Sequence, residues 1–311
     1  MKRRATYLTL SYLIVILLTV GCSMTSSVLR VFINARALRL EGPPLPIPQV
    51  EDITIPGPGG EIPLRIYRPD GTGPFPLFIY LHGGGWVFGS LDRSDNVCRY
   101  FANKVGCIVI SVDYRLAPKH KFPAAVEDAY CATQWVADNA RHLQGDPSRI
   151  AIGGASAGGN LTAVVCLMAK ERSGPTLVFQ LLAYPSTNLA TLETASYRDY
   201  GRGYGLGKSH VKWYLKQYLA NEEDSKNAYA SPLLADSLSN LPPALVFTGE
   251  YDVLRDDGEA YVKRLKREGV SARYIRYASM GHMAHWRIGK DHQVGDALNQ
   301  AAFALDHAFS Q

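Results

Sequence analysis

Gly154-Ala155-Ser156-Ala157-Gly158-Gly159 stands between a largely apolar run at 149–152 and a longer apolar run at 161–167. The first run is typical of a buried strand and the second of a helix. A Gly-x-Ser-x-Gly pattern in this setting is typical of a sharp strand-to-helix turn that exposes the serine hydroxyl. Such a turn forces unusual backbone angles on the serine, so its neighbours must be small. The stretch predicts an α/β fold with Ser156 as a candidate nucleophile.

Short apolar runs alternate with helical segments on both sides of this turn. Strands are expected at 76–81, 107–113, 150–153, 180–184, 244–248 and 272–277, and helices at 94–104, 124–139, 157–171, 256–268 and 291–307. Strands that are connected through helices and buried on both faces form a mostly parallel sheet flanked by helices. A β-hairpin of 52–55 and 62–67 is expected at one antiparallel edge of that sheet.

A second glycine-rich segment, Tyr80-Leu81-His82-Gly83-Gly84-Gly85-Trp86, follows the apolar strand residues 77–79. Bare backbone N–H groups at the end of a strand can stabilise the oxyanion that forms during acyl transfer. A phosphate-binding loop is the alternative, but no Lys-Ser or Lys-Thr pair follows these glycines. We therefore interpret the segment as an oxyanion loop.

A nucleophilic serine needs a base, and in this fold the base lies late in the chain. His282 follows the last expected strand in a loop and is the preferred base, with His285 as its competitor. His292 and His307 fall in the last expected helix, where a solvated face explains them. His210 comes before any candidate acid, so it is not favoured.

The base in turn needs an acid that orients it. Asp252 lies in the loop just past the buried strand 244–248 and is the preferred acid, with Glu250 as the alternative. Asp256 and Asp257 are interpreted as charges at a helix N-terminus, where the helix dipole stabilises them.

Composition excludes several other classes of function. The chain has 311 residues, of which 47% are hydrophobic and 20% charged, and a formal net charge of +5 to which Lys2, Arg3 and Arg4 contribute. Because no long basic run follows, we expect no nucleic-acid partner. No Cys-x-x-Cys or His-Glu-x-x-His pattern is present, so no metal site is expected. We expect scattered core thiols at Cys98, Cys107, Cys131 and Cys166, not a disulfide framework.

The N-terminus has the layout of an export signal. A basic start, Lys2-Arg3-Arg4, precedes an apolar stretch at 7–20 and the pair Gly21-Cys22. The preferred interpretation is a bacterial lipoprotein signal over residues 1–22, with Cys22 as the lipidated residue. A plain cleaved signal and an uncleaved membrane anchor are the alternatives. Each predicts export, with the N-terminus at a membrane on its periplasmic or extracellular side for the lipoprotein and the anchor.

Residues 23–311 are then expected to form one domain with a helical cap. The stretch 186–230 contains many tyrosines and no expected strand, and a helix is expected at 211–219. An insertion after a strand of an open α/β sheet lies over the ligand crevice. We therefore predict a cap formed by about 23–48 and 186–230, with a helix at 23–40 and an extended proline-rich segment at 42–48. A surface excursion without a role is the alternative.

From about Pro76 to the C-terminus, the chain resembles the hormone-sensitive-lipase-like esterases of the α/β-hydrolase superfamily. The resemblance is carried by the oxyanion loop, the serine turn and three further motifs, which are Val112-Asp113-Tyr114-Arg115-Leu116-Ala117-Pro118, Phe122-Pro123-Ala124-Ala125 and Tyr251-Asp252-Val253-Leu254-Arg255-Asp256. It implies an α/β-hydrolase fold with a helical cap and a cofactor-free esterase acting on short or medium acyl chains.

The resemblance also implies roles for individual residues. It implies Ser156 as nucleophile, His282 as base and Asp252 as acid, with the amides of Gly83, Gly84 and Ala157 as oxyanion donors. Two positions depart from the family pattern. Ala155 replaces an acidic residue, and Met283-Ala284 replaces Gly-Phe after the histidine. A lactonase or amidase with the same triad, or a non-catalytic small-molecule receptor on the same fold, is the alternative function.

Overall fold

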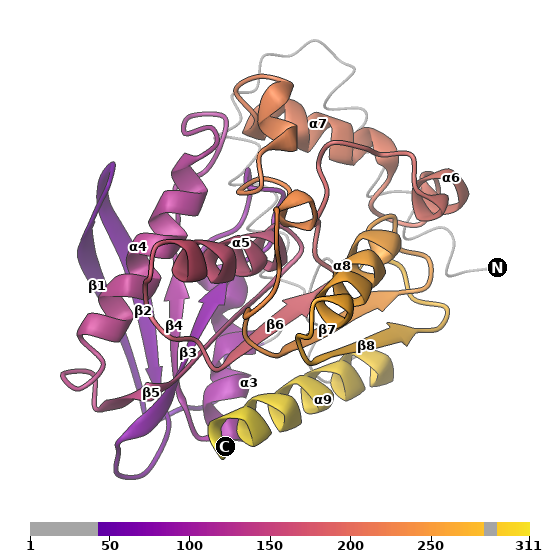
Figure 1. Cartoon of the computed structure of the whole chain (residues 1–311). Helices are drawn as coiled ribbons and strands as arrows, with labels where there is room; N and C mark the ends of the chain where they lie inside the picture. Colours follow the sequence, from indigo (N-terminus) through magenta and orange to yellow (C-terminus); the bar gives the residue numbers. More distant parts are fainter. Residues whose placement is uncertain (1–42, 283–290) are drawn as a thin grey trace.

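The computed structural model describes residues 43–282 and 291–311, which form one eight-stranded sheet in the order β1-β2-β4-β3-β5-β6-β7-β8 (Figure 1). The strands are β1 (Gln49–Gly57), β2 (Gly60–Arg68), β3 (Phe75–Leu81), β4 (Ile108–Val112), β5 (Gly145–Ala155), β6 (Phe179–Ala183), β7 (Ala244–Gly249) and β8 (Ala272–Tyr277). From β4 to β8 all neighbours are parallel, whereas β2 is antiparallel to both β1 and β4. The predicted mostly parallel sheet with an antiparallel hairpin edge is confirmed.

Helices cover both faces of this sheet. The helix α3 (Asp95–Val105) packs with α9 (His292–Phe309) on one face, and α4 (Ala124–Asp138), α5 (Ala157–Glu171) and α8 (Arg255–Arg267) cover the other. In β3, Leu77, Ile79 and Leu81 pack toward α4 and α5, while Phe78 and Tyr80 pack toward α3 and α9. Because successive side chains of a strand point to opposite faces, a strand covered on both sides is apolar throughout.

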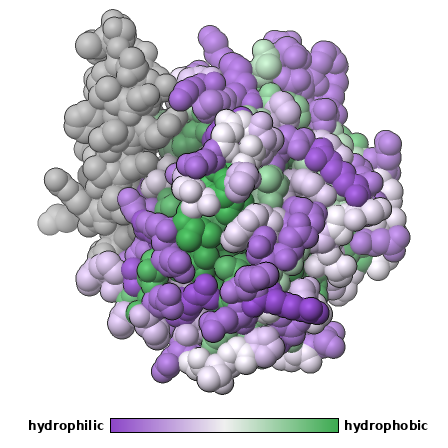
Figure 2. All heavy atoms as spheres, turned by 90° about the vertical axis from the view of Figure 1, so that its left-hand side faces the viewer, coloured by the Kyte–Doolittle hydropathy of each residue, from purple (hydrophilic) through white to green (hydrophobic). Residues whose placement is uncertain are grey.

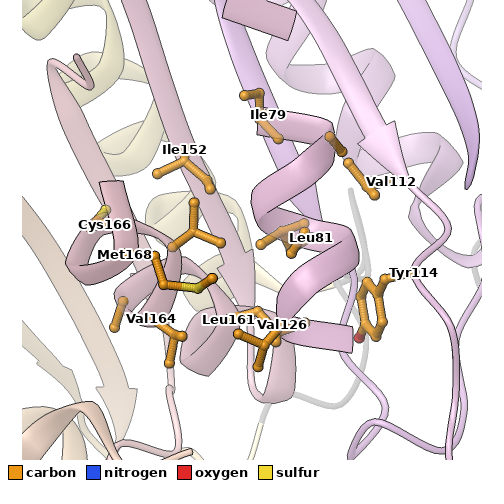
Figure 3. Packing of buried hydrophobic residues seen from close by; sticks show 14 of the residues in the cluster. Ile79, Leu81, Val112, Tyr114, Val126, Ile152, Leu161, Val164, Cys166 and Met168 are labelled. Atoms are coloured by element: carbon orange, nitrogen blue, oxygen red, sulfur yellow. The ribbon is translucent and has the colours of Figure 1, made fainter. Parts of the chain in front are cut away.

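The core under α4 and α5 is built from aliphatic side chains that interdigitate between sheet and helices. Figure 3 shows residues from both layers of this core, namely Ile79, Leu81, Val112 and Ile152 from the strands and Val126, Leu161, Val164, Cys166 and Met168 from the helices. This packing fixes the carboxyl ends of β3 and β5, where both glycine-rich motifs begin. Figure 2 shows the side that carries β1 and α4, where an apolar area is surrounded by polar side chains.

Two sequence predictions need correction. The strand expected at 150–153 begins earlier, because Gly145 pairs with Phe75 before a register irregularity in β3, and the Phe75 amide donates to the Gln144 carbonyl at 2.9 Å. Cys98, Cys107 and Cys166 are buried as expected, but Cys131 is partly exposed and contacts the Pro56 carbonyl oxygen at 3.5 Å. Cys131 lies on the side of α4 that faces the edge hairpin, where it packs against the margin of the core.

The proline-rich segment at 43–48 contains no helix or strand and is held along one side of α3. The Leu45 amide donates to Asn96 Oδ1 at 2.8 Å, and Asn103 donates from Nδ2 to the Pro46 carbonyl at 2.8 Å. The predicted signal at 1–22 with Cys22 and the predicted helix at 23–40 lie outside the described residues. Within residues 43–282 and 291–311, no helix combines the length and apolarity that crossing a membrane requires.

The stretch 186–230 forms helices and no strand, as predicted. It contains α6 (Ala195–Tyr200), α7 (Lys208–Tyr218) and a short 3-10 turn at Glu223–Lys226. Figure 1 shows α6 and α7 together on the side of the molecule away from α9. The helix α7 begins three residues earlier than expected, because His210 Nδ1 accepts a hydrogen bond from the Gly207 amide at 3.0 Å and caps its first turn.

Candidate active site

Ser156 occupies the tight junction between β5 and α5. Its φ of +56° and ψ of −116° form a strained combination, which a non-glycine residue adopts only where the surroundings fix it. A methyl group on Gly158 would lie 2.0 Å from the Leu81 carbonyl oxygen, and one on Gly154 would lie 2.4 Å from the same atom. Both glycines are therefore required for the close approach of the turn to the end of β3. The turn leaves the Ser156 side chain partly exposed.

The structure brings His282 and Asp252 to this serine. His282 Nε2 lies 3.1 Å from Ser156 Oγ, and its Nδ1 lies 2.8 Å from Asp252 Oδ2. Asp252 is fully buried, and its Oδ1 accepts a hydrogen bond from the Leu254 amide at 2.9 Å. A carboxylate at Nδ1 keeps the proton on that nitrogen and leaves Nε2 free to accept one from the serine.

The three residues follow the carboxyl ends of three parallel strands, β5, β7 and β8. Ser156 follows β5 directly, Asp252 lies three residues past β7, and His282 lies five residues past β8. The carboxyl ends of parallel strands meet at one edge of the sheet, which is where ligands of open α/β sheets bind. This edge is where residues more than 120 positions apart in the chain become hydrogen-bonded neighbours.

The loop after β3 faces this serine. A methyl group on Gly83 would lie 3.5 Å from Ser156 Cβ and 2.8 Å from the Ala155 carbonyl oxygen, so its backbone passes directly beside the turn. Within residues 43–282 and 291–311, the amides of Gly83, Gly84 and Ala157 donate no hydrogen bond to another group. Unpaired amides next to a nucleophile are the arrangement that stabilises a developing oxyanion.

His82 supports this loop from inside the fold. Its ring is buried and stacks on Tyr114, with ring centroids 4.2 Å apart, and its Nδ1 lies 3.0 Å from the Gly83 carbonyl oxygen. Tyr114 in turn donates from its hydroxyl to the His82 carbonyl at 2.7 Å. A methyl group on Gly89 would lie 2.1 Å from the same imidazole, so the returning end of the loop also packs on it.

The rejected candidates have other partners. Glu250 accepts a hydrogen bond from the Ser279 amide at 2.7 Å, while the carboxylate at the imidazole is that of Asp252. His292 and His307 are exposed on α9, as expected. His285 lies outside the described residues. His210 serves as the cap of α7, and burial lowers the pKa of its imidazole.

Asp256 and Asp257 do lie in the first turn of α8, but they do more than stabilise its N-terminus. Asp256 accepts a hydrogen bond from the Ser196 amide at 2.8 Å, and Asp257 accepts from the Thr187 and Asn188 amides at 3.0 and 3.2 Å. Burial, with a smaller contribution from the neighbouring carboxylates of Asp252 and Asp256, raises the pKa of Asp257 to about 7. The two carboxyl groups thus tie the start of the 186–230 stretch to α8.

Sequence reasoning missed Tyr184, which supports the histidine. Its ring packs edge-on against His282, with centroids 4.7 Å apart and an interplanar angle of 71°. Its φ is +38°, and its amide donates to the Phe247 carbonyl oxygen at 2.6 Å. The available signal was its position, because Tyr184 directly follows β6, which lies between the strands that carry the nucleophile and the acid.

A metal site finds no support in the described part of the chain, where no three His, Cys, Asp or Glu side chains gather closely enough to hold an ion. The chemistry available at the described site is that of a hydroxyl, an imidazole, a carboxylate and free backbone amides.

Residues 78–286 match the protein family described as alpha/beta hydrolase fold, which is more than half of the chain. The chain belongs to this α/β-hydrolase family. Within the family it is of the hormone-sensitive-lipase-like type, as its motifs implied. The matched residues include the serine turn, the oxyanion loop, Asp252 and His282.

Several curated relatives of this α/β-hydrolase are named as esterases. It is 43% identical over 274 residues to the carboxylic ester hydrolase LipN of Mycobacterium tuberculosis, an alignment that covers 86% of this chain and 72% of the relative. It is also 43% identical over 226 residues to an arylesterase of Saccharolobus solfataricus, covering 72% of this chain and 73% of that one.

Solved structures extend the likeness to the fold of the whole α/β-hydrolase. A hyperthermophilic esterase from Pyrobaculum calidifontis superposes with a TM-score of 0.90 at 43% identity, covering 98% of this chain and 96% of that chain. A thermostable carboxylesterase cloned from a metagenomic library, EstE1, superposes with a TM-score of 0.88 at 40% identity, covering 92% and 98%.

Proposed function

We propose that this α/β-hydrolase is a serine carboxylesterase that hydrolyses carboxylic esters of short or medium acyl chains. The observation that carries the proposal is the continuous line of hydrogen bonds from Asp252 through His282 to Ser156, beside a loop of unpaired amides. The names of its relatives, which include a carboxylic ester hydrolase and an arylesterase, support the same substrate class.

In the proposed acylation step, Ser156 Oγ attacks the ester carbonyl carbon while His282 Nε2 takes the hydroxyl proton. The carbonyl oxygen becomes an oxyanion, which accepts hydrogen bonds from the amides of Gly83, Gly84 and Ala157. His282 then gives its proton to the departing alkoxide, so the alcohol leaves and an acyl-serine remains. The chain's own groups supply every proton that moves.

In the proposed deacylation step, His282 removes a proton from a water molecule that attacks the acyl carbon. The second tetrahedral intermediate uses the same amides, and its collapse returns the proton to Ser156 and releases the carboxylic acid. Asp252 takes no proton in either step; it holds the imidazole and stabilises the imidazolium that forms twice per turnover.

A lactone or an amide could follow the same steps, since both carry a carbonyl that a serine can attack. A receptor function is less well supported, because the three side chains that the reaction requires are present and hydrogen-bonded. Binding alone does not require a serine held in a strained backbone conformation beside free amides.

Steady-state hydrolysis of p-nitrophenyl esters, from acetate to palmitate, tests the proposal. We expect the wild type to prefer the shorter acyl chains and Ser156→Ala to lose turnover on every ester. Matched lactone and anilide substrates separate the ester preference from the lactonase and amidase alternatives. Equal turnover by the wild type and Ser156→Ala would overturn the proposed function.

We also propose that the mature chain begins at Cys22, as an exported lipoprotein attached to a membrane through that residue. The proposal rests on the order of the basic start, the apolar stretch at 7–20 and Gly21-Cys22 in the sequence. Mass spectrometry of the N-terminal peptide from the native host tests it. Lipid on Cys22 is the expected result, and an unmodified or uncleaved N-terminus would contradict it.

A further inference from the structure

The oxyanion loop has a backbone that needs outside support. Gly84, Gly85, Trp86 and Gly89 all have positive φ, at +130°, +62°, +59° and +110°. Trp86 is not a glycine, so its left-handed conformation persists only where neighbouring groups fix it. Hydrogen bonds from the Val87 and Phe88 amides to the Gly84 carbonyl, at 3.2 and 2.9 Å, close the turn internally. They do not set the distance of the loop from Ser156.

Aromatic side chains of the helix α7 pack against the side of this loop that faces away from His82. A methyl group on Gly85 would lie 2.3 Å from Tyr214 Cδ1, so the ring of Tyr214 rests directly on the bare backbone of Gly85. The same ring packs edge-on against Phe88, with centroids 5.9 Å apart at 82°. The glycines after His82 therefore pack on both sides, Gly89 against the His82 imidazole inside the fold and Gly85 against Tyr214 of α7 outside it.

A second stack fixes the neighbouring residue. Trp86 and Tyr218 lie parallel, with ring centroids 4.4 Å apart and an interplanar angle of 5°. Tyr214 and Tyr218 are four residues apart in α7, so both rings project from one face of the helix toward the loop. One helix face thus contacts two successive residues of the loop, Gly85 and Trp86.

The position of α7 is itself fixed at its C-terminal end. Lys121 donates from Nζ to the carbonyls of Lys216 and Leu219 at 3.1 and 2.6 Å, and the Phe122 amide donates to the Tyr218 carbonyl at 2.8 Å. A cation at the last carbonyls of a helix satisfies groups that have no partner within the helix. These bonds anchor the C-terminal end of α7 to the segment before α4. They therefore hold the aromatic face of α7 against the oxyanion loop.

We propose that Tyr214 is a positioning residue for the oxyanion hole, so that α7 contributes to the chemical step and not only to substrate access. The inference rests on the proposed function, because it concerns the oxyanion donors Gly83 and Gly84 of that reaction. The contact is made by the ring of Tyr214, so a phenylalanine preserves it and an alanine removes it. Loss of the ring lets the loop relax away from Ser156 and misplaces donors that must be held closely.

The test compares Tyr214→Ala and Tyr214→Phe with the wild type, using p-nitrophenyl acetate and a trifluoromethyl ketone that forms an oxyanion on the serine. We expect Tyr214→Ala to lower kcat on the order of tenfold or more with little change in KM. The affinity for the trifluoromethyl ketone falls by a similar factor, and Tyr214→Phe restores both values. The control is Tyr229→Ala, because Tyr229 bonds to Glu171 at the opposite end of α5 from Ser156.

A rise in KM with an unchanged kcat in Tyr214→Ala would overturn the inference, because Tyr214 would then be a substrate contact alone. If Tyr214→Ala does not fold, Tyr214→Leu replaces it, because leucine keeps an apolar side chain but lacks the flat ring that lies on Gly85. This variant must also lower kcat at nearly constant KM, and an unaltered kcat would overturn the inference. Absence of turnover in the wild type itself would instead overturn the proposed function and this inference with it.

Discussion

Replacing Asp252 by asparagine tests the proposed proton path, because it changes one carboxylate oxygen into an NH₂ group. In the structure, Asp252 Oδ1 accepts from the Leu254 amide at 2.9 Å and Oδ2 faces His282 Nδ1 at 2.8 Å. An asparagine at 252 has only one side-chain oxygen, and we expect it to accept from the Leu254 amide. In the opposite orientation the side-chain NH₂ group would face the Leu254 N–H, and leaving these two buried donors unpaired would cost about 1–3 kcal/mol.

The NH₂ group of the new asparagine then faces His282 Nδ1 and forces that nitrogen to accept a hydrogen bond. The imidazole proton moves to Nε2, which can no longer take the proton of Ser156. An orienting acid replaced in this way lowers kcat by about 10⁴ in the serine-protease triad. At about 1.36 kcal/mol per tenfold, this corresponds to roughly 5.4 kcal/mol of lost transition-state stabilisation. We expect a loss of that order for Asp252→Asn.

The assay is kcat for p-nitrophenyl acetate, with circular dichroism to show that each variant is folded. Glu250→Gln is the matched control, because Glu250 bonds to the Ser279 amide and not to the imidazole. It should keep nearly full activity. The reasoning fails if Asp252→Asn keeps more than about a tenth of the wild-type kcat, or if Glu250→Gln is the inactive variant.

Two further predictions concern stability. Asp257 has its pKa raised to about 7 by burial, so between about pH 4 and 7 it is protonated when folded and ionised when unfolded. The free energy of unfolding must therefore fall as pH rises through this window, by up to about 1.4 kcal/mol per pH unit. Asp257→Asn should flatten that slope in urea unfolding, and an unchanged slope would contradict the assignment. Gly158→Ala should prevent correct folding of the serine turn, since its methyl group meets the Leu81 carbonyl at 2.0 Å. Gly295→Ala, in open space within α9, should instead stabilise the protein by roughly 0.5–1 kcal/mol. Equal effects of the two substitutions on the unfolding free energy would refute the packing argument.

The sequence predicted those features that depend on local pattern. Continuous apolar runs identified the parallel strands, and Gly-x-Ser-x-Gly and the three glycines after β3 marked the two tight backbone approaches. Asp252 and His282 could be chosen because each follows a strand, and strand ends converge in a parallel sheet. The geometry places both beside Ser156.

Features that depend on packing between distant segments could not be predicted in this way. Nothing local to Tyr214 shows that its ring rests on Gly85, or that Tyr184 packs against the imidazole. Asp257 has the pattern of an ordinary helix N-terminal charge, and only its buried bonds to Thr187 and Asn188 distinguish it. The early start of β5 was missed because Gly145 pairs with Phe75 across a register irregularity.

Labelling with a fluorophosphonate, followed by peptide mass spectrometry, tests the central claim most directly. A serine reacts with this reagent when a base removes its proton and nearby amides hold the phosphoryl oxygen. We predict one adduct per chain, on Ser156, formed by the wild type and by Tyr229→Ala but not by Ser156→Ala. A wild-type protein that forms no adduct, or that is labelled at another residue, would contradict the account.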